Sequence, residues 1–385
     1  MPQSSVTPHS KLPAVGTTIF TVMSKLAADS GAINLSQGFP DFPTDPALFE
    51  ATLKAMRDGR NQYAPMTGVP ELRQAIAQKV TAHYGARYDA ETEVTVTAGA
   101  TQAIFTALAA LVSPGDEVIV FEPVYDSYRP AVETVGGKVL AAQLSFPDYR
   151  PDWNQVRALI SPRTRVIMIN SPHNPTGSLL SRSDLDTLAE LTRDTSIVVL
   201  SDEVYEHIVF DGAQHASVVQ HPELAERSIV VSSFGKTYHI TGWKIGYVLA
   251  PSVLMSEFRK IHQFNVFSVH TPSQLGIAAY MAEPKHHLTL PDFYQQKRDF
   301  FRAQLAASRF TLLPCHGTYF QLAAYQEIAD RPDHEFAQWL TREVGVAVIP
   351  VSAFCQGGRD DRVVRFCFAK QEATLAAAGA LLRQV

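Results

Sequence analysis

Cysteine, excess basic charge and long apolar runs are all scarce in this 385-residue chain. Its three cysteines lack metal-type spacing and are too few for a disulfide framework, which favours a reducing compartment. Lys and Arg number 33 against 38 Asp and Glu, so the net charge is −5. A net acidic chain without a basic run argues against nucleic acid or an anionic membrane as a partner.

Membrane-crossing and targeting segments are not indicated either. The longest apolar stretch, residues 103–112, contains Thr106 and falls short of the ~20 residues that cross a bilayer. The N-terminus, MPQSSVTPHSKLP, has no apolar core of the kind found in signal peptides. The 13 histidines include no HExxH motif, so no metal is predicted. We therefore expect a soluble cytoplasmic protein.

The apolar pattern predicts an α/β fold. Short β-branched runs alternate with helical patterns, and several runs lack polar alternation, as strands covered by helices on both faces do. Strands are expected at 94–97, 117–121, 138–142, 165–169, 196–200, 228–232 and 245–250. This alternation favours a mostly parallel sheet with right-handed crossovers.

The two ends of the chain predict a second, smaller unit. An extended arm over 1–16 precedes a helix at about 17–29, and a helix-rich pattern follows residue 252. Further strands are expected at 318–322, 346–349 and 362–368, before a final helix. We therefore expect a large domain over 46–284, a small α+β domain over 285–385, and a segment over 1–45 that packs with the small domain.

Chemically useful residues follow four of the expected strands, at the carboxyl ends where open parallel sheets bind ligands. The small residues 98–102 open a helix whose N–H groups suit a phosphate. Asn174 lies in the rigid loop SPHNPTG, and Asp202 follows a wholly apolar strand. Lys236 ends another buried strand close to Lys244, which disfavours its ammonium form. Taken singly, each has an ordinary explanation, such as a tight turn or a lysine that extends to solvent.

Together, these four groups match one ligand, pyridoxal 5'-phosphate. Its phosphate needs helix N–H groups and its aldehyde needs a lysine. Its ring nitrogen needs a carboxylate, and its phenolic oxygen needs hydrogen-bond donors.

The motifs in this order resemble class I/II pyridoxal-phosphate-dependent aminotransferases of fold type I, the aspartate aminotransferase superfamily. The subgroup of methionine, kynurenine and glutamine aminotransferases is the most similar. The resemblance rests on NLSQGFPDFP (34–43), NQYAPMTGVPELRQAI (61–76), TAGATQA (97–103), NSPHNPTG (170–177), SDEVYE (201–206), SFGKTYHITGWKIGY (233–247) and RFCFAK (365–370). It implies a large domain with a mostly parallel sheet covered by helices, plus a smaller α+β domain.

The resemblance also implies which residues hold the cofactor ring. Lys236 would form the Schiff base and later move the proton of the substrate Cα. Asp202 would pair with the pyridinium nitrogen and keep it protonated. Asn174 and Tyr205 would donate hydrogen bonds to the phenolic oxygen, and Tyr125 would stack on the ring.

The phosphate would be held from both subunits of a homodimer with shared active sites. The backbone at Ala100 and Thr101 and the side chains of Ser233 and Lys244 would bind it. Tyr63 would reach it from the partner subunit. Many family members carry arginine where this chain has Lys244, so the charge is kept but the bidentate fork is lost.

The resemblance places the substrate carboxylate at Arg365, whose fork suits two-point recognition, with help from Asn174 and the Gly38 backbone. Members specific for dicarboxylates use a second arginine from the partner, in a stretch that corresponds here to 264–270 and contains none.

Aromatic residues look like the lining of the side-chain pocket instead, namely Phe20, Phe267 and Tyr63. Such a pocket favours methionine, phenylalanine, tyrosine, tryptophan, kynurenine or glutamine over aspartate. The stretches SFGKTYHITGWKIG and FSVHTPSQL resemble methionine-preferring bacterial members most closely.

The expected function is therefore transfer of the amino group of a neutral L-amino acid, methionine preferred, to a 2-oxo acid. The nearest alternative is a pyridoxal-phosphate-dependent carbon–sulfur β-lyase on the same scaffold. A second alternative, a non-catalytic sensor, needs an attached basic DNA-binding module. Only about 16 residues precede the first expected helix, which argues against such a module.

Overall fold

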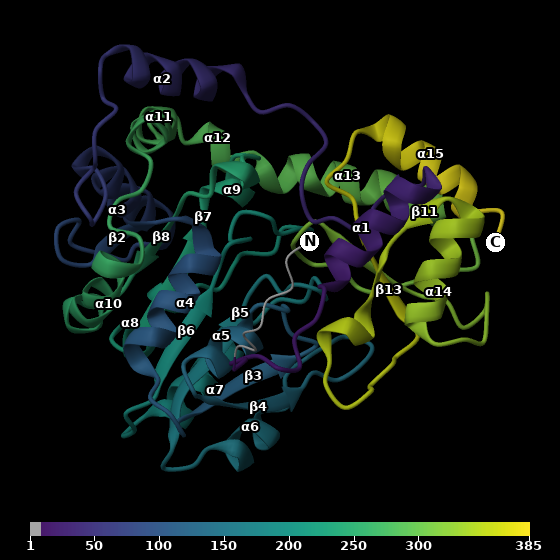
Figure 1. Cartoon of the computed structure of the whole chain (residues 1–385), viewed down its shortest axis with the longest axis horizontal. Helices are drawn as coiled ribbons and strands as arrows, with labels where there is room; N and C mark the ends of the chain where they lie inside the picture. The colour runs from purple at the N-terminus through teal and green to yellow at the C-terminus, as the bar shows by residue number, and fades with distance from the viewer. Residues whose placement is uncertain (1–8) are drawn as a thin grey trace, which may run out of the picture.

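The computed structural model describes residues 9–385 of the chain (Figure 1). The predicted arm over 1–16 lies partly outside these residues, and 9–18 contain only turns and bends. The first helix, α1 (Ile19–Ser30), is capped by Thr18, whose side chain accepts from the Thr21 N–H. Gly31 ends it in the left-handed conformation, with φ of 62°.

The remaining helices cover the two units of the fold. They are α2 (Pro46–Arg57), α3 (Pro70–Tyr84), α4 (Gly99–Leu111), α5 (Tyr128–Thr134), α6 (Trp153–Leu159), α7 (Arg182–Thr192), α8 (Pro222–Ala225), α9 (Phe234–Thr237), α10 (Ser252–Asn265), α11 (Thr271–Met281), α12 (Lys285–Leu288), α13 (Leu290–Leu305), α14 (Asp333–Trp339) and α15 (Glu372–Leu382). Short helical turns lie at η1 (Val218–Gln220), η2 (Thr241–Trp243), η3 (Leu340–Val344) and η4 (Val351–Phe354). None of the helices within residues 9–385 is long and apolar enough to cross a membrane.

All seven predicted strands of the large sheet are present, with ends shifted by no more than two residues. They are β2 (Val94–Thr97), β3 (Glu117–Glu122), β4 (Lys138–Gln143), β5 (Thr164–Asn170), β6 (Val198–Asp202), β7 (Ser228–Ser233) and β8 (Gly246–Leu249). Their order is β2-β8-β7-β6-β5-β3-β4, and only β8 runs antiparallel to its neighbours. The predicted α/β fold with a mostly parallel sheet is therefore confirmed.

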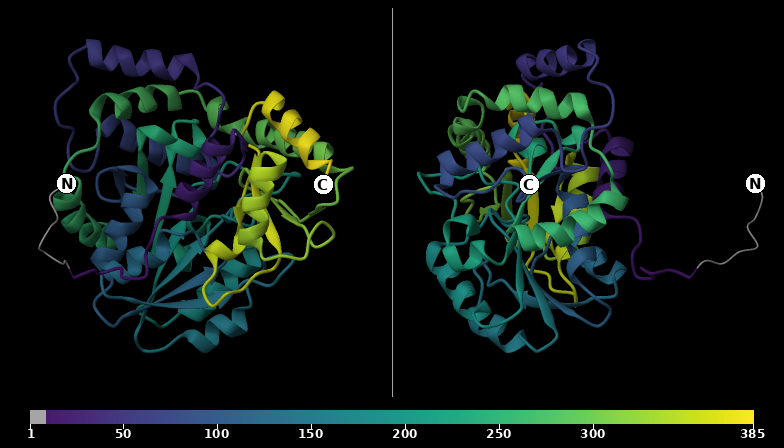
Figure 2. Two further views of the ribbon diagram at one scale, coloured as in Figure 1. Left: turned by 45° about the vertical axis from the view of Figure 1, so that its right-hand side comes forward. Right: turned by 90° about the vertical axis from the view of Figure 1, so that its left-hand side faces the viewer.

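The strands lack polar alternation because both faces of the sheet are covered. In β3, Val118 and Val120 pack in a core with residues of α4, α5 and α10. Ile119 and Phe121 point the other way, into a core with α3, α6, α7 and α11. Figures 1 and 2 show the sheet between these two helical layers.

The N-terminal and C-terminal segments share a separate core. Here β1 (Ile33–Asn34) pairs in parallel with β11 (Val346–Ala347), and Met23 and Leu35 pack with Phe336 and Leu375. Figures 1 and 2 show α1, in purple, beside the yellow-green C-terminal elements. The domain boundaries after residues 45 and 284 stay a prediction.

One strand expected in this unit is not a single strand in the structure, so that prediction is wrong. The run 346–349 splits into β11, which pairs with β1, and β12 (Ile349–Pro350), which pairs with β13 (Val363–Cys367). The second small sheet has the order β12-β13-β10-β9, with β10 (Phe320–Ala324) beside β9 (Thr311–Leu312). A continuous apolar run does not reveal that two different sheets use its two halves.

All three cysteines are unpaired, and Cys315 and Cys367 are buried. The expected cytoplasmic location stays a prediction.

Candidate active site

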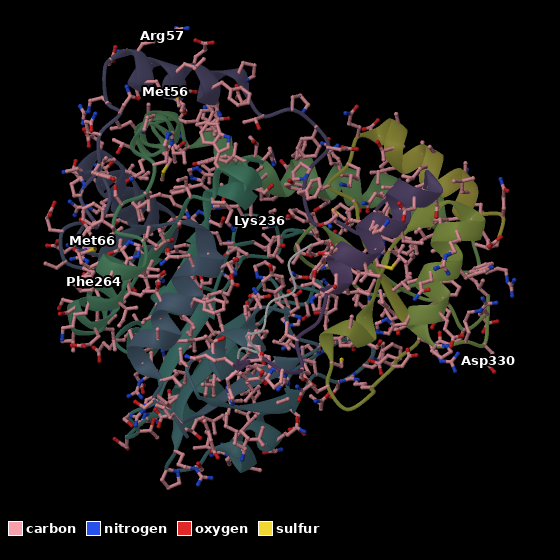
Figure 3. All side chains as sticks on the ribbon, viewed as in Figure 1. Met56, Arg57, Met66, Lys236, Phe264 and Asp330 are labelled. Atoms are coloured by element: carbon pink, nitrogen blue, oxygen red, sulfur yellow. The ribbon has the colours of Figure 1, made fainter. Side chains whose placement is uncertain are left out.

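The carboxyl ends of β2, β3, β5, β6 and β7 all open onto one cavity of about 330 Å³. Among the residues predicted from the sequence, it is lined by Phe20, Gly38, Ala100, Thr101, Tyr125, Asn174, Asp202, Tyr205, Ser233, Lys236, Lys244 and Arg365. Figure 3 labels Lys236 near the middle of the molecule, between the sheet and the C-terminal elements. The fold thus brings together residues that are far apart in the sequence.

One end of the cavity is suited to an anion. Helix α4 begins at Gly99, with φ of 78°, and no side chain caps it. The Ala98 N–H bonds to Gln102, whereas the first-turn N–H groups of a helix have no intrahelical partner. A Cβ at Gly99 would lie 3.4 Å from the Lys244 Nζ, so the ammonium group lies against this turn. Helix N–H groups and an adjacent cation together suit a phosphate.

Asp202 is buried at the end of β6 and is held by two donors. The Tyr128 hydroxyl donates to its Oδ2 at 2.5 Å, and the Val204 N–H donates to its Oδ1 at 3.2 Å. Burial nevertheless raises the pKa of the Asp202 carboxyl to about 6. A cationic group in the cavity would relieve this cost, because an opposite charge favours the ionised carboxylate.

Lys236 lies in the short helix α9, next to the end of β7. The Ser233 Oγ caps this helix by accepting from the Gly235 N–H at 3.2 Å. Burial lowers the pKa of Lys236 to about 8, and Lys244 lowers it further while Asp202 opposes the shift. The neutral, nucleophilic amine is therefore more populated near neutral pH than in an exposed lysine.

Arg365 is 1% exposed, and its guanidinium group is only partly satisfied. Nη1 donates to the Asn174 Oδ1 at 2.7 Å and Nη2 to the Ser36 carbonyl at 3.1 Å. Nε has no hydrogen-bond partner among the described residues. Burial lowers the pKa of Arg365 but leaves a cation, and a buried, unsatisfied cation beside a cavity suits a carboxylate.

Aromatic rings form the wall beside this arginine. The guanidinium carbon lies 3.9 Å from the centre of the Phe320 ring and 5.3 Å from that of Phe20. The Phe320 ring also leaves no space at Gly38, where a Cβ would approach its Cζ to 2.8 Å. Glycine at this position therefore lets the 36–39 backbone pass close to the cavity.

Sequence reasoning missed Tyr128, Tyr319 and Phe320. Tyr128 follows the predicted Tyr125 by only three residues, and this closeness could have indicated it. Tyr319 and Phe320 immediately precede or begin β10, whose residue Leu322 lies opposite Arg365 in the neighbouring strand. The strand predicted at 318–322 is present but shifted by two residues, and nothing local in the sequence shows which strand it pairs with.

Two predicted residues do not reach the cavity of their own chain. Tyr63 is 81% exposed and Phe267 is 50% exposed, and their ring centres lie 5.2 Å apart. Both roles therefore stay predictions. Within residues 9–385, no three His, Cys, Asp or Glu side chains are grouped so as to hold a metal ion.

Comparison with known proteins adds independent evidence. Residues 30–380 match the family "Aminotransferase class I and II". The chain is 52% identical to a methionine aminotransferase of Escherichia coli, over 100% of both chains. A crystal structure of an Escherichia coli protein with methionine aminotransferase function superposes with a TM-score of 0.97 at 52% identity, covering 99% of this chain and 100% of that one.

More distant relatives are also aminotransferases. A probable N-succinyldiaminopimelate aminotransferase of Mycobacterium tuberculosis is 41% identical over 95% of each chain. Human kynurenine–oxoglutarate transaminase 1 is 33% identical over 94% of each. The match of the family over most of the chain, and the site at the strand ends, lead to one conclusion: this chain belongs to the class I and II aminotransferases.

Proposed function

We propose that this aminotransferase takes the amino group from a neutral L-amino acid, with methionine preferred, and transfers it to a 2-oxo acid. The count of cations in the cavity supports this. Among the described residues that line it, only Lys236, Lys244 and Arg365 carry positive charge. Each has a use in any member of the family, and the 264–270 stretch, which corresponds to the source of the partner's arginine in dicarboxylate-specific members, contains none.

Class I and II aminotransferases use pyridoxal 5'-phosphate, and the residues of this cavity fit it. The uncapped start of α4 and Lys244 suit the phosphate, and buried Asp202 suits the ring nitrogen. The Oδ1 of Asn174 accepts from Arg365, which leaves its amide N–H groups free to donate to the phenolic oxygen. When bound, the cofactor supplies an electron sink for the charge that develops at the substrate Cα.

Side chains of the protein would carry out the remaining steps. Arg365 binds the substrate carboxylate, with Asn174 and the Gly38 backbone beside it. The Tyr128 hydroxyl holds the Asp202 carboxylate, which would pair with the ring nitrogen. The neutral amine of Lys236 would take the proton from the substrate Cα and pass it to the cofactor carbon bonded to the nitrogen. In the second half of the reaction it would move a proton in the reverse direction, onto the Cα of the 2-oxo acid.

The wall of Phe20 and Phe320 supports an apolar substrate side chain. An apolar pocket separates similar side chains by only about 1–3 kcal/mol, so aromatic amino acids and glutamine are expected as weaker substrates. The identity to the Escherichia coli methionine aminotransferase supports methionine within this group.

Titration of the purified protein with amino acids tests this substrate class. The visible band of the lysine-bound cofactor is expected to disappear with methionine, and more slowly with phenylalanine or glutamine. Aspartate is expected to change it poorly, because its second carboxylate finds no cation. A faster response to aspartate than to methionine would contradict the proposal. Ammonia release from a sulfur amino acid without any 2-oxo acid would instead indicate the lyase.

We further propose that the chain forms a homodimer with shared active sites. Exposed aromatic side chains support it: Phe264 is 89% exposed, and Tyr63 and Phe267 lie against each other. Figure 3 shows Phe264 and Met66 together at one edge of the molecule, away from Lys236. Exposed large apolar side chains that gather in one region are typical of an interaction surface.

Hybrid dimers test whether Tyr63 serves the partner's site. In a hybrid of a Lys236→Ala chain and a Tyr63→Ala chain, a shared arrangement gives one site with both changes and one wild-type site. We expect the purified hybrid to regain activity that neither variant homodimer has. A hybrid no more active than the Tyr63→Ala homodimer would show that Tyr63 does not act across the interface.

A further inference from the structure

Three segments of the chain meet at the ε-amino group of Lys236. Its Nζ lies 2.8 Å from the Tyr319 hydroxyl oxygen and 3.2 Å from the Gly38 carbonyl oxygen. The Tyr319 hydroxyl in turn donates to the same Gly38 carbonyl at 2.6 Å. The lysine lies in α9, Tyr319 immediately precedes β10, and Gly38 lies between α1 and α2.

The number of protons on the Lys236 amine and the Tyr319 hydroxyl determines which group donates in each of these three hydrogen bonds. The single hydroxyl proton of Tyr319 is used on Gly38, so toward Lys236 its oxygen can only accept. A neutral amine has two N–H bonds and one lone pair, and two acceptors are present. Both N–H bonds are therefore engaged, and the lone pair occupies the remaining tetrahedral corner.

We propose that Tyr319 is a positioning residue for the free amine of Lys236, holding it so that its lone pair is available for the proton of the substrate Cα. This inference rests on the proposed function, because it assigns Lys236 the proton transfer. It adds a residue of the small domain to a site otherwise built mainly from the large sheet.

The packing around Tyr319 suits such a role. The side chain is buried, with ring centres at 5.2 Å from Tyr205, 5.7 Å from Tyr294 and 4.9 Å from Phe320. Burial also raises the pKa of the Tyr319 hydroxyl well above its ordinary value, so it keeps its proton at neutral pH. A side chain fixed by its neighbours holds a partner more accurately than a mobile one does.

The groups around Lys236 determine how loss of the Tyr319 hydroxyl changes the pKa of the amine. Burial lowers the pKa of the amine, Lys244 and Arg365 lower it further, and Asp202 and Cys367 oppose them. Tyr319 adds an acceptor, which favours the ammonium form. Tyr319→Phe should therefore shift the pKa of Lys236 to lower values, while the phenylalanine ring keeps the packing.

The test combines two measurements on the full-length chain. In the cofactor-free protein, labelling with acetic anhydride across pH, read at the Lys236 peptide, gives the midpoint for this amine. In the cofactor-loaded protein, single-turnover kinetics with methionine and Cα-deuterated methionine give the rate and isotope effect. Tyr325→Phe is the matched control, because Tyr325 is equally buried beyond the other end of β10 and donates to the Arg331 carbonyl at 2.8 Å.

We expect Tyr319→Phe to lower the labelling midpoint and to slow the methionine half-reaction by about 10- to 100-fold at saturating methionine. The isotope effect should increase, because proton transfer becomes the slower step. Tyr325→Phe should match the wild type in all three.

An unchanged midpoint overturns the inference, as does a shifted midpoint with a normal rate and isotope effect. Failure of the proposed function would give a different experimental result. The wild-type protein itself would then respond poorly to methionine, whatever the Tyr319 variant does.

Discussion

Lys236→Ala is expected to abolish the visible absorbance band of the cofactor-loaded protein and to reduce kcat by at least about 100-fold. The variant lacks both the amine that attaches the cofactor and the base that moves the substrate proton. Absorbance spectra after addition of pyridoxal 5'-phosphate, followed by steady-state kinetics with methionine, measure both effects. No other lysine can replace it, because the remaining lysine in the described lining, Lys244, lies against the start of α4.

The control for this variant removes a lysine from the far edge of the sheet. Lys138 begins the edge strand β4, where its exposed ammonium group lies 3.6 Å from Glu117. Lys138→Ala should keep the band and the turnover of the wild type. Circular dichroism should show that both variants are folded. A Lys236→Ala protein with normal turnover would refute the assigned site.

The site concentrates three charged groups whose ionised forms are all disfavoured: Asp202 and Arg365 are buried, and Lys236 is half-buried. Burial raises the pKa of Asp202 and lowers the pKa values of Lys236 and Arg365. Each of these groups would therefore be stabilised by a partner of opposite charge or by a covalent bond that removes its charge. Functional sites often retain such locally unfavourable arrangements, which the rest of the fold supports.

The sequence was sufficient to predict those strands and site residues that a local pattern determines. Apolar runs located the large-sheet strands because both faces are buried, as Val118 and Ile119 illustrate. The motifs that follow these strands located Asp202 and Lys236, because parallel strands bring their carboxyl ends to one edge.

Residues positioned by nonlocal pairing were not predictable in this way. Tyr319 reaches Lys236 only because β10 lies beside β13 and the 36–39 segment crosses the cavity, which no short pattern encodes. Tyr63 and Phe267 depend on a second copy of the chain, so a single chain leaves their roles as predictions.

Arg365→Ala should reduce kcat/KM for every α-amino acid by roughly 30- to 4000-fold, the equivalent of about 2–5 kcal/mol for a buried, charge-assisted contact. Cofactor content should change little, because the hydrogen-bond partners of Arg365 are Asn174 and Ser36, and neither Lys244 nor the start of α4, which suit the phosphate, is among them. Arg365→Lys should recover only part of the loss, since an ammonium group keeps the charge but not the fork.

A substrate pair separates loss of the carboxylate contact from general damage. 3-(Methylthio)propylamine is methionine without its carboxylate, so it gains nothing from Arg365. The wild type should prefer methionine over this amine by a large factor, and Arg365→Ala should remove most of that preference.

The Arg365→Met variant controls for unfolding, because methionine fills much of the volume without burying a charge. Its Tm should not fall below that of the wild type. If these variants still discriminated between the two compounds as the wild type does, the carboxylate would be bound elsewhere. The unpartnered Nε of Arg365 would then require another anion to explain it.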